Sequence, residues 1–125
     1  MGRLFITIAA SSGLLAVALG AFGAHALKNR LDDYALGVYH TAVEYQFYHT
    51  LALLAVGLLS LWYPQSQLLR ASGVGFTAGI VIFSGSLYLL AFTGIRVLGA
   101  ITPIGGVAFI VAWICLALAA WRLID

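Results

Sequence analysis

The first long apolar run of the sequence is LFITIAASSGLLAVALGAFGA, residues 4–24, which contains no charged side chain. A helix rises about 1.5 Å per residue and the hydrocarbon core of a bilayer is roughly 30 Å thick, so about 20 apolar residues cross it. Three further runs of this kind lie at about residues 44–63, 71–93 and 97–121. The sequence therefore predicts an all-α integral membrane protein, a four-helix transmembrane bundle that forms one domain over residues 1–125.

The composition agrees with a membrane protein and excludes several other classes. Of the 125 residues, 63% are hydrophobic and only 8% are charged, which is unlike soluble domains. The six basic residues are scattered singly, so we expect no nucleic-acid partner. Cys115 is the only cysteine and fits no metal or redox motif, and we expect neither a metal nor a cofactor. The expected partners are membrane lipids, with a second copy or another membrane protein as a further candidate.

The first apolar run has an alternative interpretation as a secretory signal, because Ala24-His25-Ala26 resembles a signal cleavage site. The run is longer than the apolar core of a typical signal. An uncleaved first span is therefore favoured.

The connection between the first two spans, about residues 32–43, is predicted to be helical. Asp32 and Asp33 are candidate N-caps, and apolar residues recur after them at helical spacing. This connection can continue into the second span as one helix of about 30 residues. Gly37 is the expected position of a bend.

The orientation in the membrane is not decided by charge. Four crossings place both termini on one side, and short loops rich in Lys and Arg favour the cytoplasm. The two sides carry equal numbers of basic residues, namely Arg3, Arg70 and Arg122 against Lys28, Arg30 and Arg96. If Arg96 is partly buried, the balance moves towards cytoplasmic termini.

The predicted helices have faces of different character. On the second span, a side rich in leucine is expected to face lipid and a side of polar and small residues to face the other helices. The expected inward residues are Glu44, Tyr45, Tyr48, His49, Ala52 and Ala55. Small residues form stripes suited to close helix packing, at Ala9, Gly13, Ala16, Gly20 and Ala24 and at Gly75 and Gly79.

The fourth span contains a proline within its predicted length. Pro103, followed by Gly105 and Gly106, removes a backbone donor and predicts a kink or local unwinding. Broken helices line the binding sites of some transporters. A structural kink whose backbone groups are satisfied by Thr102 or by a neighbouring helix is the favoured alternative.

Polar residues gather in the half of the predicted bundle that borders the first and third loops. We expect a ligand-binding or structural polar cluster there, formed by His25, Glu44, Tyr45, Tyr48, His49, Ser84, Tyr88, Arg96 and Thr102. Such a cluster can bind a ligand or a proton, or it can fix the helix register through hydrogen bonds. In the second case, Glu44 and Arg96 are the expected ion pair.

Specific chemistries have less support. Two histidines on different helices, His25 and His49, raise the possibility of a haem site, but His25 lies away from the packing stripe of its helix. A metal site from His40, Glu44 and His49 is disfavoured because His49 points roughly 140° away from Glu44. We identify no set of nucleophile, base and orienting residue and expect no catalytic residues, so an enzyme is the third choice.

Several short blocks resemble a known family. They are LGAFGAH at residues 19–25, EYQ at 44–46, HTLA at 49–52, FSGSLY at 83–88 and TPIGG at 102–106. Their order and spacing resemble the small bacterial YgdD/YwdK-type membrane proteins, a family of unknown function with an uncharacterised eukaryotic transmembrane relative. The resemblance implies a multi-pass protein of the bacterial inner membrane with four spans and both termini cytoplasmic. It implies no activity, cofactor or catalytic residue.

Two hypotheses for function follow. The first is a non-enzymatic membrane protein whose polar cluster, in the non-cytoplasmic half, binds a lipid-like or small amphipathic ligand or stabilises a contact with a partner. The alternative is a proton-linked transporter or channel that uses Glu44 and His49, which would need water and alternating access around these residues.

Overall fold

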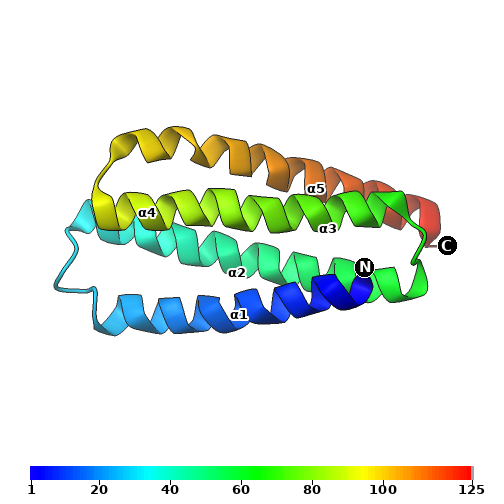
Figure 1. Cartoon of the computed structure of the whole chain (residues 1–125), viewed down its shortest axis with the longest axis horizontal. Helices are drawn as coiled ribbons and strands as arrows, with labels where there is room; N and C mark the ends of the chain where they lie inside the picture. Colours follow the sequence, from blue (N-terminus) through cyan, green and yellow to red (C-terminus); the bar gives the residue numbers. More distant parts are fainter. Residues whose placement is uncertain (125) are drawn as a thin grey trace.

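The structure is a computed structural model that describes residues 1–124, and it consists of antiparallel helices joined by short turns (Figure 1). The first span is α1 (Gly2–His25) and the second is α2 (Asp33–Trp62). The third span contains α3 (Gln67–Gly79), the π-helical turn η1 (Ile80–Ser84) and α4 (Gly85–Thr93). The fourth contains the 3₁₀ turn η2 (Arg96–Ala100) and α5 (Thr102–Leu123).

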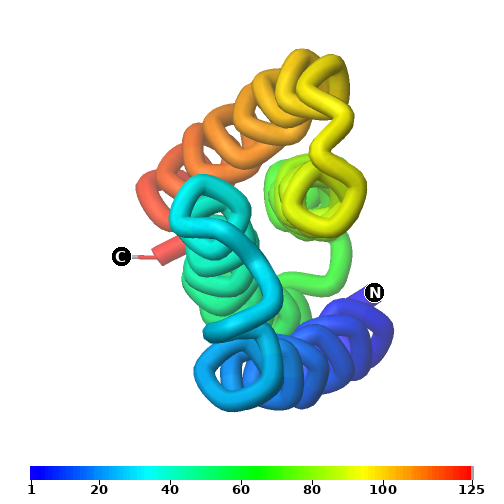
Figure 2. Tube along the Cα trace, turned by 90° about the vertical axis from the view of Figure 1, so that its left-hand side faces the viewer, coloured from blue at the N-terminus to red at the C-terminus, as the bar shows by residue number. Residues whose placement is uncertain are grey.

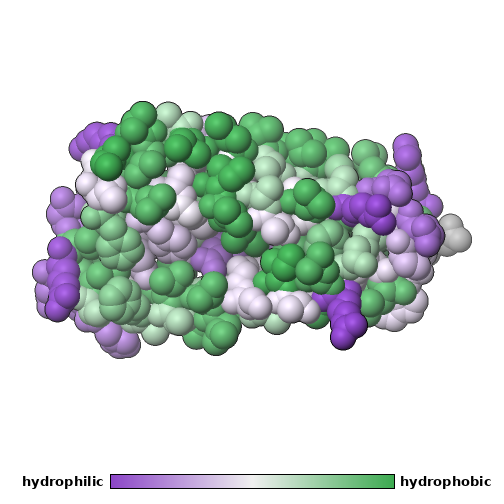
Figure 3. Space-filling view, in the orientation of Figure 1, coloured by the Kyte–Doolittle hydropathy of each residue, from purple (hydrophilic) through white to green (hydrophobic). Residues whose placement is uncertain are grey.

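All four spans are long enough and apolar enough to cross a bilayer. The space-filling view shows an apolar belt that covers most of the length of the molecule, with hydrophilic residues concentrated at its two ends (Figure 3). The expected all-α architecture with four spans is therefore confirmed. The protein is an integral membrane four-helix bundle.

The start of α2 is set by a local capping interaction. The carboxylate of Asp32 accepts a hydrogen bond from the Ala35 backbone N–H at 2.8 Å, as an N-cap residue does. From there α2 continues as one helix of 30 residues through Gly37 to Trp62. The expected helical connection over residues 32–43 is thus the first part of the second span.

The helices form a staggered row in cross-section rather than a closed square (Figure 2). α1 packs on α2, α2 packs on the third span, and α5 packs on α3 and η1. α1 and α5 lie at opposite edges of the row (Figure 2). This arrangement leaves one side of α1 without a helix beside it.

The small-residue stripes lie at helix contacts, as expected. An added Cβ at Gly13 would lie 3.6 Å from the Thr50 side chain, which is ordinary contact between α1 and α2. Both contacts are closer elsewhere: a Cβ at Gly57 of α2 would lie 2.7 Å from the Ile6 side chain of α1, and a Cβ at Gly75 of α3 would lie 2.9 Å from the Cβ of Ala112 of α5. Ala24, by contrast, is exposed, so the stripe on α1 does not extend to its last turn.

The fourth span is locally irregular just before Pro103, where the 3₁₀ turn η2 gives way to α5, but α5 itself has no kink at Pro103. α5 begins at Thr102, which places Pro103 in the first turn, where a backbone N–H has no helical acceptor to lose. Gly105 and Gly106 then continue a regular helix. A second irregular turn lies in the third span at η1, beside Gly105, where an added Cβ would clash with the backbone of Phe83.

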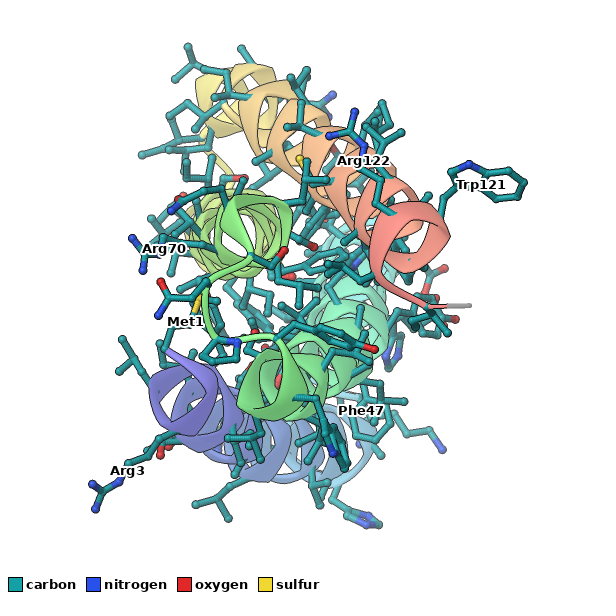
Figure 4. The ribbon with its side chains drawn as sticks, turned by 90° about the vertical axis from the view of Figure 1, so that its right-hand side faces the viewer. Met1, Arg3, Phe47, Arg70, Trp121 and Arg122 are labelled. Atoms are coloured by element: carbon teal, nitrogen blue, oxygen red, sulfur yellow. The ribbon has the colours of Figure 1, made fainter. Side chains whose placement is uncertain are left out.

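One end of the bundle carries both termini and the loop between the second and third spans. In the view onto this end, Met1, Arg3, Arg70 and Arg122 all lie near the viewer (Figure 4). Trp121 points away from the other helices (Figure 4), and 87% of its surface is exposed. This position is typical of an aromatic anchor at a membrane interface.

Candidate functional site

A buried glutamine links three helices near the middle of the bundle. Gln46 of α2 is only 5% exposed, and its Nε2 donates to the Ser12 backbone carbonyl of α1 at 3.0 Å and to Ser12 Oγ at 3.3 Å. The Tyr88 hydroxyl of α4 donates to Gln46 Oε1 at 2.6 Å. The hydroxyls of Ser12 and Thr50 share a further hydrogen bond of 2.7 Å. We call these four residues the Gln46 junction.

The Gln46 junction lies deep in the apolar belt. Ser12 is close to the middle of α1, and the neighbouring Gly13 faces Thr50 across the contact between α1 and α2. An unpaired polar group at this depth would cost several kcal/mol. Among the described residues, no buried side-chain nitrogen or oxygen lacks a hydrogen-bond partner. The junction therefore fastens the three helices.

Other buried hydroxyls connect further pairs of elements, one at a time. Ser84 of η1 donates to the carbonyl of Ala42 at 2.7 Å, and Ser72 of α3 donates to the carbonyl of Ala112 at 2.8 Å. The hydroxyls of Ser86 and Thr102 are 2.6 Å apart. These bonds lie in separate places along the bundle and do not converge on one point.

His49 lies in a layer of aromatic rings rather than in a polar site. Its ring stacks on Phe109 of α5, with centroids 3.5 Å apart and planes at 7°. Phe76 and Trp113 lie beside it, with ring centroids at 5.9 Å each. The Nδ1 atom is 2.7 Å from the carbonyl oxygen of Tyr45, one turn earlier in α2. This aromatic layer fills the space between α2, α3 and α5.

The expectation that Glu44, Tyr48 and Ala55 point inward is wrong, because all three are exposed. Tyr45 is partly exposed at 37%, and its ring stacks on Phe83 at 4.6 Å. Each helical residue is rotated by about 100° from the last, so Glu44 lies roughly 200° from Gln46. The burial of Gln46 against Ser12 therefore turns Glu44 outward.

The expected ion pair between Glu44 and Arg96 does not form in residues 1–124. Arg96 is exposed at the end of the bundle, and its guanidinium carbon lies 5.0 Å from the centroid of the Tyr34 ring. His25 is also exposed, at the last turn of α1. The nine residues of the expected cluster are thus distributed between the surface and several separate contacts.

Only one residue of the expected cluster lies in the Gln46 junction. Tyr88 belongs to the Gln46 junction, whereas Ser84, Thr102 and His49 have partners elsewhere. Ser12, Gln46 and Thr50 were missed by the sequence analysis. The EYQ and HTLA blocks contain two of them, and an amide or hydroxyl inside an otherwise apolar span was the signal that could have identified them.

A groove opens between α1 and the third span next to the Gln46 junction. Its inner part has a volume of about 310 Å³ and is lined by Thr7, Ile8, Ser11, Ser12, Leu15, Gln46, Thr77, Ile80 and Val81. An apolar part of about 470 Å³ continues towards the end that carries the termini, lined by Leu4, Phe5, Ile8, Val74, Thr77, Ala78, Val81 and Ile82. We call the two parts together the α1–α3 groove.

The α1–α3 groove lies where α1 and the third span face each other without packing closely along their length. In the space-filling view, pale and hydrophilic atoms are visible between the apolar rows of α1 and the third span (Figure 3). Ile8, Thr77 and Val81 line both parts, so the parts are continuous. The apolar part of the groove therefore continues into an inner part that is lined by Ser12 and Gln46 of the Gln46 junction.

The residue types do not form a metal centre. Within residues 1–124, no group of three or more His, Cys, Asp or Glu side chains is placed to hold a metal ion. The α1–α3 groove has apolar walls with a few hydroxyls and one amide.

Fold and composition define the class as a small integral membrane protein with four spans. Residues 19–106 match a family model described as a protein of unknown function, DUF423. Relatives described as UPF0382 membrane proteins match almost the whole chain. The chain therefore belongs to this family of membrane proteins of unknown function.

Three relatives illustrate the range of the similarity. YwdK of Bacillus subtilis is 49% identical over 118 residues, which cover 94% of this chain and 96% of the relative. A protein of Staphylococcus aureus is 48% identical over 96% of this chain and 97% of its own length. One of Haemophilus influenzae is 44% identical over 98% and 97%. No solved structure matches the chain.

Proposed function

We propose that this membrane protein binds a lipid-like or small amphipathic molecule in the α1–α3 groove. The observation that carries the proposal is an apolar groove, open towards the membrane, that ends at the buried amide of Gln46. Its two parts have volumes of about 310 and 470 Å³, within the range of roughly 300–1,000 Å³ typical of ligand pockets. The proposed role is binding rather than catalysis.

The lining hydroxyls support a ligand that supplies a hydrogen-bond donor. Thr7, Ser11 and Thr77 each donate to the backbone carbonyl four residues earlier, at 2.8 Å in all three cases. A hydroxyl whose single proton is used in this way keeps lone pairs that accept a hydrogen bond. The expected ligand therefore combines an alkyl chain with a hydroxyl or N–H group that reaches the inner part of the groove.

Native mass spectrometry of the protein extracted with its lipids tests the proposal. We expect wild-type protein to retain a bound lipid-like molecule and Ala78→Trp to lose it, because the indole fills the apolar part of the groove. Val107→Trp is the matched control, since Val107 is exposed on the outer face of α5. Equal retention in the three proteins would contradict the proposal.

The donor requirement has a test of its own. We expect 1-hexadecanol to raise the unfolding temperature of the detergent-solubilised protein more than hexadecyl methyl ether does, since only the alcohol has a proton to donate. Thr77→Val should reduce this difference while it preserves the shape of the side chain. Equal shifts with both compounds would remove the donor requirement.

We propose further that the protein resides in the bacterial inner membrane with both termini in the cytoplasm. The family resemblance supports this orientation. Charge does not, because Arg96 is exposed and the count of basic residues on the two sides stays equal. Reporter fusions at residue 125 and within residues 28–33 test it, and a periplasmic reporter at residue 125 would overturn it.

The alternative of a proton-linked transporter has less support. Its two key residues, Glu44 and His49, lie on different sides of α2, one exposed and the other within the aromatic layer. No groove described above is lined by either residue.

A further inference from the structure

Two arginines flank the mouth of the α1–α3 groove at the end of the bundle that carries the termini. Arg3 precedes Leu4, which lines the apolar part on α1, and Arg70 lies one helical turn before Val74, which lines it on α3. Figure 4 shows Arg3 and Arg70 on the same side of the bundle, whereas Arg122 lies on α5. All three side chains are exposed. The mouth of the groove is therefore cationic, and a further arginine lies at the same end but away from the groove.

The acidic side chains of residues 1–124 lie far from this mouth. They are Asp32, Asp33 and Glu44, which stand at the start and in the first half of α2, and α2 begins at the opposite end of the bundle (Figure 1). Within residues 1–124, Arg3 and Arg70 thus have no acidic partner. Arginines at a membrane surface also favour one orientation of the chain. That role requires no particular position relative to a groove.

A hydrogen-bond acceptor lies just inside the mouth. Thr7 is one turn deeper than Arg3, about 6 Å along α1 at 1.5 Å per residue. Its hydroxyl donates to the Arg3 carbonyl at 2.8 Å and keeps lone pairs that accept a hydrogen bond. Apolar walls formed by Ile8, Leu15 and Val81 border the groove deeper in the bundle. From its mouth inwards, the groove therefore presents cations, an acceptor and an apolar surface.

We infer that the α1–α3 groove holds an anionic lysophospholipid, a phospholipid with a single acyl chain, and this inference rests on the proposed binding function. A phosphate monoester carries a charge of about −1.5 to −2 at pH 7 and accepts paired hydrogen bonds from guanidinium groups. Both arginine side chains are long and exposed, so they can turn towards one phosphate at the mouth. In a lysophospholipid, a free glycerol hydroxyl lies between the phosphate and the chain. Phosphate, hydroxyl and chain thus follow the order of the arginines, Thr7 and the apolar walls.

A diacyl phospholipid and a free phosphate ion match the groove less well. In a diacyl lipid, the glycerol hydroxyl beside the phosphate is esterified and has no proton to donate to Thr7. A free phosphate ion would leave the apolar part of the groove unfilled. The single-chain lipid supplies all three groups at once.

Titration of the purified full chain by native mass spectrometry tests the inference with two lipids. The probes are 1-oleoyl lysophosphatidic acid and 1-oleoyl lysophosphatidylcholine, which share the chain and the glycerol hydroxyl but differ in net charge. We expect wild-type protein to bind the acid about tenfold more tightly. Arg3→Gln and Arg70→Gln should each weaken binding of the acid about fivefold and change binding of the choline lipid by less than about twofold. Arg122→Gln is the matched control and should change neither.

The possible outcomes separate the inference from the proposed function. Equal affinities of the wild-type protein for the two lipids would overturn the inference but leave binding in the groove intact, and no binding of either lipid would contradict both. A loss in Arg122→Gln as large as in Arg3→Gln would overturn the inference, because the effect would then not depend on the groove. Displacement of the acid by an equal concentration of inorganic phosphate, or tighter binding of dioleoyl phosphatidic acid, would also overturn it.

Discussion

The two outer helices are attached to the rest of the bundle in different ways. α1 is held by the Gln46 junction, in which an amide, two hydroxyls and a phenol join α1, α2 and α4. α5 is held by close packing of Gly75, Gly79 and Gly105 and by two separate hydrogen bonds, at Ala112 and at Thr102, rather than by a connected polar group. In lipid, apolar side chains gain little free energy when they move from lipid into a helix contact. Hydrogen bonds and close packing therefore hold membrane helices together.

This difference is related to the position of the groove. α3 and α5 pack closely, as at Gly75 and Ala112, whereas α1 packs along α2 and borders a groove on its side towards α3. A helix fastened by a few polar contacts can border a groove without loss of its anchorage. The groove therefore lies at the polar edge of the bundle, which is the contact of α1 with α2, whereas the packed edge is the contact of α5 with α3 and η1.

The largest effect is expected at the packed edge. Gly105→Ala would place a Cβ 2.7 Å from the Cβ of Phe83 and 2.8 Å from its Cα, a backbone atom that cannot move aside. We expect a loss of about 3 kcal/mol in unfolding free energy. Thermal unfolding in detergent measures it.

Two neighbouring glycines provide matched controls for Gly105. A Cβ at Gly106 would meet Phe83 only at 3.9 Å, and one at Gly85 would meet nothing within 4 Å. Alanine at either position should therefore be neutral or stabilising by up to about 1 kcal/mol, from helix propensity alone. A loss at the controls as large as at Gly105 would show that close packing does not distinguish this edge.

The second prediction concerns the aromatic layer. His49→Ala removes the ring that stacks on Phe109 and should cost about 2–3 kcal/mol, whereas His49→Phe keeps the stack and should cost less than about 1 kcal/mol. Unfolding temperatures of the two variants test this. If phenylalanine is as harmful as alanine, the nitrogen atoms of His49 have a role that packing does not explain.

The smallest effect is expected outside both edges. Glu44→Gln and Arg96→Gln, measured on dilute monomeric protein, should each cost less than about 1 kcal/mol, because both residues are exposed. Their effects should also be additive, since the two side chains do not meet. A coupling energy above about 1 kcal/mol in the double variant would restore the ion pair that the sequence predicted.

The sequence predicted the architecture well because hydropathy and capping act locally. Apolar length located the four spans, and the position of Asp32 before a periodic segment located the start of α2. The stripes of small residues likewise predicted which sides of the helices meet. These features depend on neighbouring residues along one helix and need no knowledge of the others.

The polar site was predicted poorly because burial depends on partners in other helices. Periodicity alone placed Glu44 inward, but the hydrogen bonds offered by Ser12 and Tyr88 select Gln46 instead. The role of Pro103 depended similarly on where α5 begins, which is set by η2 and the turn before it.

The most direct test of the difference between the two edges is a double-mutant cycle with Gln46→Leu and Tyr88→Phe. Each single variant leaves a polar atom of the other residue without its partner at mid-depth, so each should lower the unfolding free energy. Hydrogen bonds between membrane helices contribute about 0.6 kcal/mol on average and up to about 1.7 kcal/mol, and we expect a coupling of about 1 kcal/mol. The double variant should therefore lose about 1 kcal/mol less than the two single losses combined. Strict additivity would contradict the account, because it would mean that the Gln46 junction does not fasten the helices.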